Sequence, residues 1–126
     1  MDWAGTYEGV LPCADCTGIK TTIVLNNDNT YFKTSGYLDE EENVFDEKGT
    51  FEWNNTGSVI TLIHDSGSHQ YQVGENKLIL LDINGNKIAG DLAENYILRK
   101  NKELHTFLYK FGIKRNLLLL TSSNRN

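Results

Sequence analysis

Residues 18–38 read GIKTTIVLNNDNTYFKTSGYL, and this segment gives the clearest indication of the fold. It contains two runs in which apolar and polar side chains alternate with a period near two, as they do in half-buried β-strands. The runs are separated by Asn-Asn-Asp-Asn at residues 26–29. Asn and Asp tolerate positive φ and hydrogen-bond to their own backbone, as tight antiparallel turns require. The stretch therefore predicts a β-hairpin made of residues 18–25 and 30–38.

The same pattern extends in both directions, from Gly5 to Lys100. Clusters of Gly, Asn, Asp and Ser separate the runs, and no amphipathic helix interrupts them. The strands predicted in this way are residues 5–11, 18–25, 30–38, 44–53, 59–64, 69–73, 77–81 and 94–98. Short connections favour an all-β, up-and-down antiparallel barrel of about eight strands, because closure removes exposed sheet edges. A β-sandwich is the competing architecture.

The aromatic residues Trp3, Tyr31, Phe51 and Trp53 are candidates for the barrel interior. We expect them to pack in the core. The alternative is that they line a cavity for a small apolar ligand.

Composition limits the class of protein. The chain has 126 residues and a net charge of −5, which fits one domain with its own core and argues against a nucleic-acid partner. No apolar run approaches the roughly 20 residues of a membrane-spanning helix. Met1 is followed directly by Asp2 and Trp3, without the basic and apolar regions of a signal peptide. We therefore expect either a cytosolic protein or a mature fragment with an added Met.

The charge changes sign near the end of the chain. Residues 1–98 contain 5 basic and 16 acidic side chains, whereas residues 99–126 contain 7 basic and 1 acidic. We predict a barrel domain over residues 1–100 and a basic tail over residues 101–126, docked on the acidic barrel or partly disordered. In the tail, Phe107, Tyr109, Phe111 and Ile113 alternate as in a strand, while Leu104, Phe107, Leu108 and Phe111 have helical spacing, so both structures stay open. Exchange of the tail between protomers would make a dimer.

Cys13-Ala14-Asp15-Cys16 forms a C-x-x-C motif, the feature of the sequence with most chemistry. Two cysteines at this spacing can chelate a soft metal, cycle between dithiol and disulfide, or form a static disulfide. A four-ligand zinc site lacks its second C-x-x-C, and thioredoxin-like chemistry lacks the helix N-terminus that it needs. A two-thiolate loop for Cu(I) and a local disulfide both stay open.

His64 and His69 flank a four-residue turn, so they are candidate additional metal ligands on adjacent strands. The common catalytic motifs for acyl transfer, phosphate binding and zinc proteolysis are absent from the sequence. We therefore expect no catalytic residues and no enzymatic activity.

Several segments together resemble the N-terminal domain of the copper-resistance lipoprotein family NlpE. The similarity covers about residues 3–100. The segments that carry it are residues 7–21 (YEGVLPCADCTGIKT), 25–31, 49–53 (GTFEW), 77–82 (KLILLD), 84–88 and 96–98 (YIL).

This resemblance implies a lipocalin-like barrel in the periplasm, tethered to the outer membrane through a lipidated N-terminal Cys of the precursor. It also implies a link to copper tolerance and to envelope-stress sensing through a sensor protein. Only Cys13 and Cys16 match the family's suspected metal or redox element. The lipobox Cys and the second, OB-like domain of larger members are absent from this sequence.

The sequence leaves three candidate functions open. The first is a non-enzymatic envelope lipoprotein domain whose Cys13/Cys16 loop binds Cu(I) or reports redox state. The second is a carrier of a small apolar ligand, with the cysteines as a structural disulfide. The third is an interaction platform for an envelope sensor protein.

Overall fold

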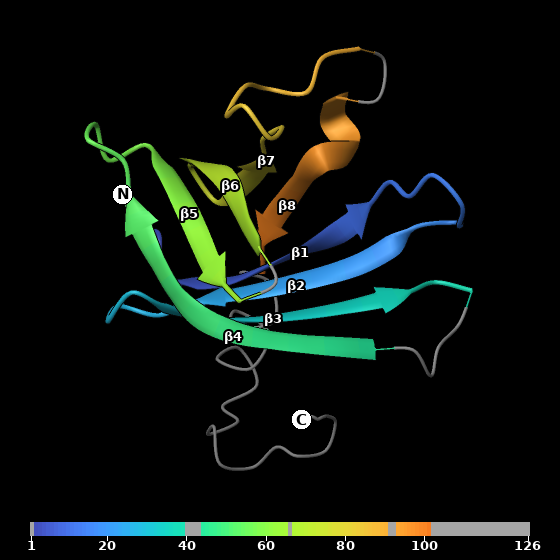
Figure 1. Cartoon of the computed structure of the whole chain (residues 1–126), viewed down its shortest axis with the longest axis horizontal. Coiled ribbons are helices and arrows are strands. Elements are labelled where there is room, and N and C mark those ends of the chain that lie inside the picture. The colour runs from blue at the N-terminus through green and yellow to red at the C-terminus, as the bar shows by residue number, and fades with distance from the viewer. Residues whose placement is uncertain (1, 40–43, 66, 91–92, 102–126) are drawn as a thin grey trace, which may run out of the picture.

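The computed structural model describes residues 2–39, 44–65, 67–90 and 93–101. They form eight strands and one short 3-10 helix (Figure 1). The elements are β1 (Gly5–Leu11), β2 (Ile19–Leu25), β3 (Thr30–Tyr37), β4 (Val44–Trp53), β5 (Val59–His64), β6 (Gly67–Gly74), β7 (Lys77–Leu80), η1 (Ala93–Tyr96) and β8 (Ile97–Lys100).

The strands form a closed antiparallel barrel in which each strand pairs with the next along the chain. Closure is made by β8, whose Arg99 and Lys100 pair with Glu8 and Tyr7 of β1. The predicted up-and-down barrel is therefore confirmed, and the sandwich is not formed. Seven of the eight predicted strands agree with the structure to within two residues at each end.

The strand predicted over residues 94–98 is wrong in its placement. Residues 93–96 form η1, and β8 begins at Ile97. The helical turn places Tyr96 in a groove on the outside of the barrel, with Ile79 and Ile88. The alternation of apolar and polar residues did not reveal this difference. Tyr96 and Leu98 fit a single longer strand as well as a helical turn followed by a short strand.

The core lies inside the barrel and is built by alternate residues of each strand. Fully buried side chains fill it, so the interior is packed. They are Tyr7, Thr21, Ile23, Leu25, Tyr31, Phe51, Ile60, Leu62, Tyr71, Leu78 and Leu98.

One end of the barrel is closed by aromatic rings. The Trp3 ring meets Phe51 and Trp53 edge to face, with centroids 5.6 and 5.4 Å apart. The Tyr7 hydroxyl donates a hydrogen bond of 2.6 Å to the Trp3 carbonyl, which fixes the chain entry. Of the four predicted interior aromatics, Tyr31 and Phe51 are buried, and Trp3 and Trp53 pack against the core.

The described chain starts at this closed end, where Lys100 Nζ donates to the Asp2 carbonyl at 2.6 Å. The opposite end carries the β1–β2 loop with the C-x-x-C motif, the β3–β4 and β5–β6 connections, and the long β7–β8 connection. No helix in the part of the chain that the structure describes is long and apolar enough to cross a membrane. The predicted tail lies outside the described residues, apart from Asn101.

Candidate functional site

The C-x-x-C motif lies in the loop between β1 and β2, and its cysteines are joined. Cys13 and Cys16 form a disulfide with their Cα atoms 5.3 Å apart, a separation within the usual range for this bond. Both cysteines are half-buried, while Ala14 and Asp15 between them are exposed. The bond is therefore within reach of small reagents at the rim of the barrel.

Hydrogen bonds and tight packing hold the loop against the neighbouring strand. The Gly18 carbonyl accepts a bond of 3.0 Å from the Leu38 amide, and Cys16 Sγ lies 3.6 Å from the same carbonyl oxygen. A Cβ at Gly18 would lie 2.7 Å from Cγ1 of Val10, so only glycine fits here without displacing side chains. The end of β1 and the start of β2 thus anchor both ends of the loop that holds the disulfide.

The two histidines lie on the same face of adjacent strands, in a diagonal arrangement. His64 is opposite Gly67, and His69 is opposite Leu62. Diagonal neighbours have Cβ atoms about 7 Å apart. Among the residues that the structure describes, no group of three or more His, Cys, Asp or Glu side chains could hold a metal ion. The structure therefore does not bring the histidines together with Cys13 and Cys16.

A polar cluster that the sequence did not reveal lies inside the barrel. The Tyr31 hydroxyl donates a hydrogen bond of 2.5 Å to Oε2 of Glu47. Burial and the Glu47 charge raise the pKa values of Tyr31 and Tyr71 well above the usual value of a phenol. Both tyrosines therefore stay protonated. Tyr31, Glu47 and Tyr71 lie on β3, β4 and β6. Their proximity therefore depends on how these strands pair, which the sequence pattern does not specify.

His69, beside this cluster, gives stability a weak pH dependence. Burial, and then the Lys33 charge, lower the pKa of the imidazole from its ordinary value of 6.5. A lowered pKa means that the folded state binds fewer protons, so this contribution to stability is complete above about pH 6.5 and is lost as the pH falls below it. Acidification should therefore destabilise His69→Gln less than wild type. The expected difference is below about 1 kcal/mol, because solvent still reaches much of the side chain and screens its charge.

The measurement is urea unfolding of wild type and His69→Gln at about pH 7.5 and about pH 5.5. Ser68→Ala, on the opposite face of the same strand, is the matched control. An equal loss of stability on acidification in wild type, His69→Gln and Ser68→Ala would show that His69 does not cause this pH dependence.

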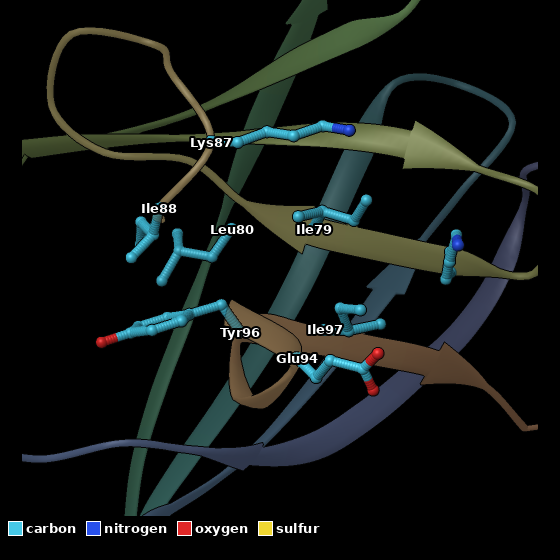
Figure 2. A pocket seen from close by; sticks show the side chains of 8 residues that line it. Ile79, Leu80, Lys87, Ile88, Glu94, Tyr96 and Ile97 are labelled. Carbon is cyan, nitrogen blue, oxygen red and sulfur yellow. The ribbon is translucent and has the colours of Figure 1, made fainter. Parts of the chain in front are cut away.

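The hollow that the described residues form on the inner face of the barrel is small. A cavity of about 130 Å³ lies at its open end, lined by Leu11, Ile19, Thr21, Lys33, Ser35, Gly36, Tyr37 and Phe45. Ligand pockets usually measure about 300–1,000 Å³. Larger hollows lie on the outer surface: about 330 Å³ over β2, β3 and the start of β4, and about 240 Å³ over β7 and β8, where Ile79, Ile88 and Tyr96 lie (Figure 2). The inner hollow formed by the described residues is therefore smaller than an ordinary ligand pocket.

Comparison with known proteins identifies the family. The model of the NlpE N-terminal domain matches residues 7–91, which include the C-x-x-C loop and most or all of seven strands. The chain belongs to the NlpE N-terminal domain family. Lipoprotein NlpE from Escherichia coli (strain K12) is 36% identical over 96 residues, which cover 74% of this chain and 39% of that protein. The chain thus spans about two fifths of that relative's length.

Two solved structures are similar to this chain in both fold and sequence. A Shewanella oneidensis protein described as a lipoprotein is 51% identical, with a TM-score of 0.74 over 81% of this chain and 92% of its own. The Cpx pathway activator NlpE from E. coli is 32% identical, with a TM-score of 0.58 over 69% of this chain and 46% of its own. These relatives are named lipoproteins or a pathway activator.

Proposed function

We propose that this NlpE-family domain is a non-enzymatic envelope lipoprotein domain whose Cys13/Cys16 loop reports oxidation state or binds Cu(I). The observation that carries the proposal is the position of the two sulfurs, which are joined in an accessible loop at the rim of a packed barrel. Reduction of the disulfide takes up two electrons and two protons and gives two thiols, and Cu(I) accepts two or three sulfur ligands.

The short spacing of the cysteines supports a chemical role for them rather than a stabilising one. The disulfide links residues only three positions apart. In the chain-entropy model, closing so short a loop stabilises the fold by only about 2 kcal/mol, against nearly 5 for a loop of roughly 100 residues. Opening the bond would leave the barrel folded, as a reversible redox reporter requires.

The names of the relatives support a proposal for the location and the partner of this chain. Relatives in E. coli and Treponema pallidum are named lipoproteins, so we propose a periplasmic domain tethered to the outer membrane through a lipidated precursor. The E. coli relative is described as the activator of the Cpx pathway. For this chain we propose an envelope sensor protein as the partner, with copper resistance and envelope-stress sensing as the cellular role.

The test is an anaerobic Cu(I) competition titration against a strong chelator. We expect the reduced protein to compete, because both thiolates are free. The oxidised protein and Cys13→Ser/Cys16→Ser should bind Cu(I) on the order of 100-fold more weakly or not at all. His64→Gln/His69→Gln tests whether the histidines add ligands. Equal competition by the reduced wild type and the double Ser variant would refute the metal site, while loss of competition in the His variant would place those residues in it.

A further inference from the structure

A groove on the outer wall of the barrel combines apolar and basic side chains. It lies over β7, β8 and the connection between them, and its volume is about 240 Å³. Figure 2 shows Ile79 and Ile97 next to each other in the groove, with Lys87 on one side and Glu94 on the opposite side. Ligand pockets are usually larger. A hollow of this size therefore suits one or two side chains of a larger partner.

Two cations are opposite each other at this groove. Lys77 lines it, and the register places Arg99 directly opposite Lys77 on the same outer face. Like charges that face each other across a strand pair destabilise a sheet. Within the part of the chain that the structure describes, Lys77, Lys87 and Arg99 form no salt bridge. The fold therefore retains a local charge conflict, as functional sites often do, and an anionic partner would relieve it.

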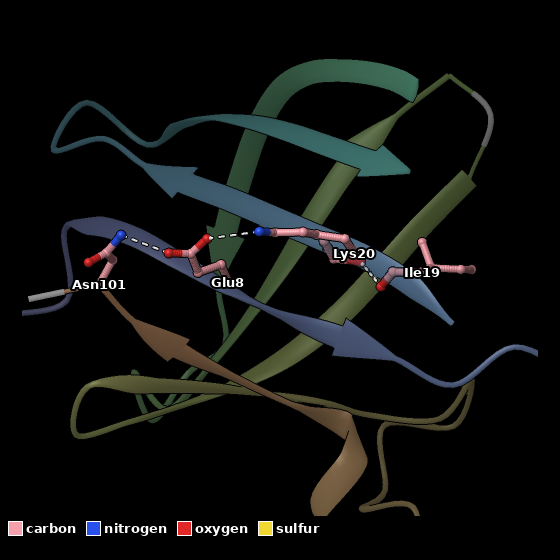
Figure 3. Close-up of polar contacts among 5 residues, drawn as sticks. Glu8, Ile19, Lys20 and Asn101 are labelled. Atoms are coloured by element: carbon pink, nitrogen blue, oxygen red, sulfur yellow. Dashed lines mark hydrogen bonds and ion pairs between the residues drawn. The ribbon is translucent and has the colours of Figure 1, made fainter. Parts of the chain in front are cut away.

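The carboxylate opposite Arg99 on β1 does not neutralise it. This carboxylate belongs to Glu8, and other groups contact both of its oxygens. Lys20 Nζ lies 3.9 Å from Oε1, and the side-chain amide of Asn101 donates to Oε2 at 2.7 Å (Figure 3). Arg99 itself is exposed to solvent.

The charge at the groove is opposite to that of the barrel as a whole. Residues 1–100 contain 7 basic and 16 acidic side chains. Lys77, Lys87 and Arg99 are three of those basic residues. Among the lining residues that the structure describes, Glu94 alone is acidic, so the cations outnumber it. A net positive groove on a negatively charged barrel favours an acidic partner and disfavours a second copy of the barrel.

The apolar side chains of the groove are recessed. Ile79, Ile88, Tyr96 and Ile97 are all half-buried, so they form the walls of a hollow. A recessed apolar site flanked by charges fits a bulky side chain of a protein segment, as anchor residues fit at protein interfaces. A membrane-binding face instead presents apolar side chains that project into the lipid.

We propose that this groove binds an acidic segment of a partner protein. One bulky apolar side chain of the segment enters the hollow. Carboxylates on either side of it pair with Lys87 and with the two opposed cations, Lys77 and Arg99. The lining residues that the structure describes include neither cysteine, so this inference does not rest on the redox or Cu(I) role proposed for the disulfide loop.

The experiment is an NMR titration of the isotope-labelled full chain with the peptide Asp-Asp-Phe-Asp-Asp, blocked at both ends. At about 20 mM salt, the amide signals of Ile79, Ile88 and Tyr96 should shift with a dissociation constant on the order of 1 mM. Lys87→Glu should weaken this binding about fivefold. Lys48→Glu makes the same charge change at an exposed position of β4 and should leave the dissociation constant within about twofold of wild type.

Two further peptides separate the apolar contribution from the charge. Replacing Phe with Ala in the acidic peptide should weaken binding at least about threefold, because the hollow is then left unfilled. The basic peptide Lys-Lys-Phe-Lys-Lys should not shift the groove signals. Mapping the shifts by residue distinguishes binding in the groove from binding to basic residues elsewhere in the chain.

Lys77→Glu adds a measurement of stability. This substitution replaces repulsion between opposed cations by attraction, so it should weaken binding of the acidic peptide and raise the midpoint of thermal unfolding by roughly 1–4 °C. A lower midpoint would show that the two cations stabilise the barrel, which would contradict the charge conflict that the proposal needs.

Three results of the titration would overturn the proposal. They are unshifted groove signals at about 5 mM acidic peptide, equal binding of the Phe and Ala peptides, and equal weakening by Lys87→Glu and Lys48→Glu. Vesicles of phosphatidylglycerol test the alternative partner. Binding to them that is lost in Lys87→Glu, together with no response to the acidic peptide, would assign the groove to a membrane surface and overturn the proposal.

Discussion

Replacing Phe51 with alanine is expected to lower the free energy of unfolding by about 3–5 kcal/mol. Phe51 is 2% exposed and contacts the rings of both Trp3 and Trp53 at the closed end of the barrel. The substitution removes this contact area and leaves a cavity in a packed interior, which cannot collapse fully around the gap. We expect the midpoint of thermal unfolding to fall by roughly 10–20 °C.

Phe32→Ala is the matched control for this experiment. Phe32 lies on the adjacent strand β3, but its side chain is on the outer face and is 40% exposed. Its removal should cost less than about 1 kcal/mol. Urea unfolding followed by tryptophan fluorescence measures both variants. Similar losses for Phe51→Ala and Phe32→Ala would show that the aromatic cluster does not stabilise the closed end.

Gly49→Ala is expected to destabilise the barrel by about 2–3 kcal/mol. A Cβ at this position would lie 2.5 Å from the backbone oxygen of Ile63 and 3.2 Å from the Tyr31 ring. The carbonyl belongs to β5, so it can move only if the strand moves. Tyr31 would also be displaced, and its buried hydroxyl would lose its short hydrogen bond to Glu47.

Gly74→Ala provides the comparison, because the atoms nearest to a Cβ there belong to the flexible side chain of Lys77. We expect a change within about 0.5 kcal/mol for this variant. Calorimetric unfolding of both proteins tests the difference. A Gly49→Ala protein as stable as Gly74→Ala would mean that β5 yields easily next to β4.

The strands could be predicted from the sequence because each one buries a single face. Leu25, Tyr31 and Phe51 lie on that face, and the Asn-rich turns mark where the chain reverses. Barrel closure followed from the short connections. The start of β8 was missed because its position depends on pairing with Tyr7 and Glu8, about ninety residues earlier in the chain.

The candidate site was predictable only in part. The spacing of Cys13 and Cys16 allowed both a thiolate pair and a disulfide, and the sequence contains nothing that favours one oxidation state. The Tyr31–Glu47 contact depends on register between strands, as does the diagonal placement of His64 and His69. Within the part of the chain that the structure describes, the length over which β5 pairs with β4 also depends on register, which alternation alone does not determine.

The chain entry and the disulfide lie at opposite ends of the barrel, joined by the seven residues of β1. A strand of that length rises about 23 Å, or about 18 Å along the axis once its tilt is considered. At physiological ionic strength this separation is about two Debye lengths, so charges at the amino end of the barrel are largely screened from the sulfurs of Cys13 and Cys16. A partner or surface that binds the amino end would therefore leave the disulfide accessible and its electrostatic surroundings almost unchanged.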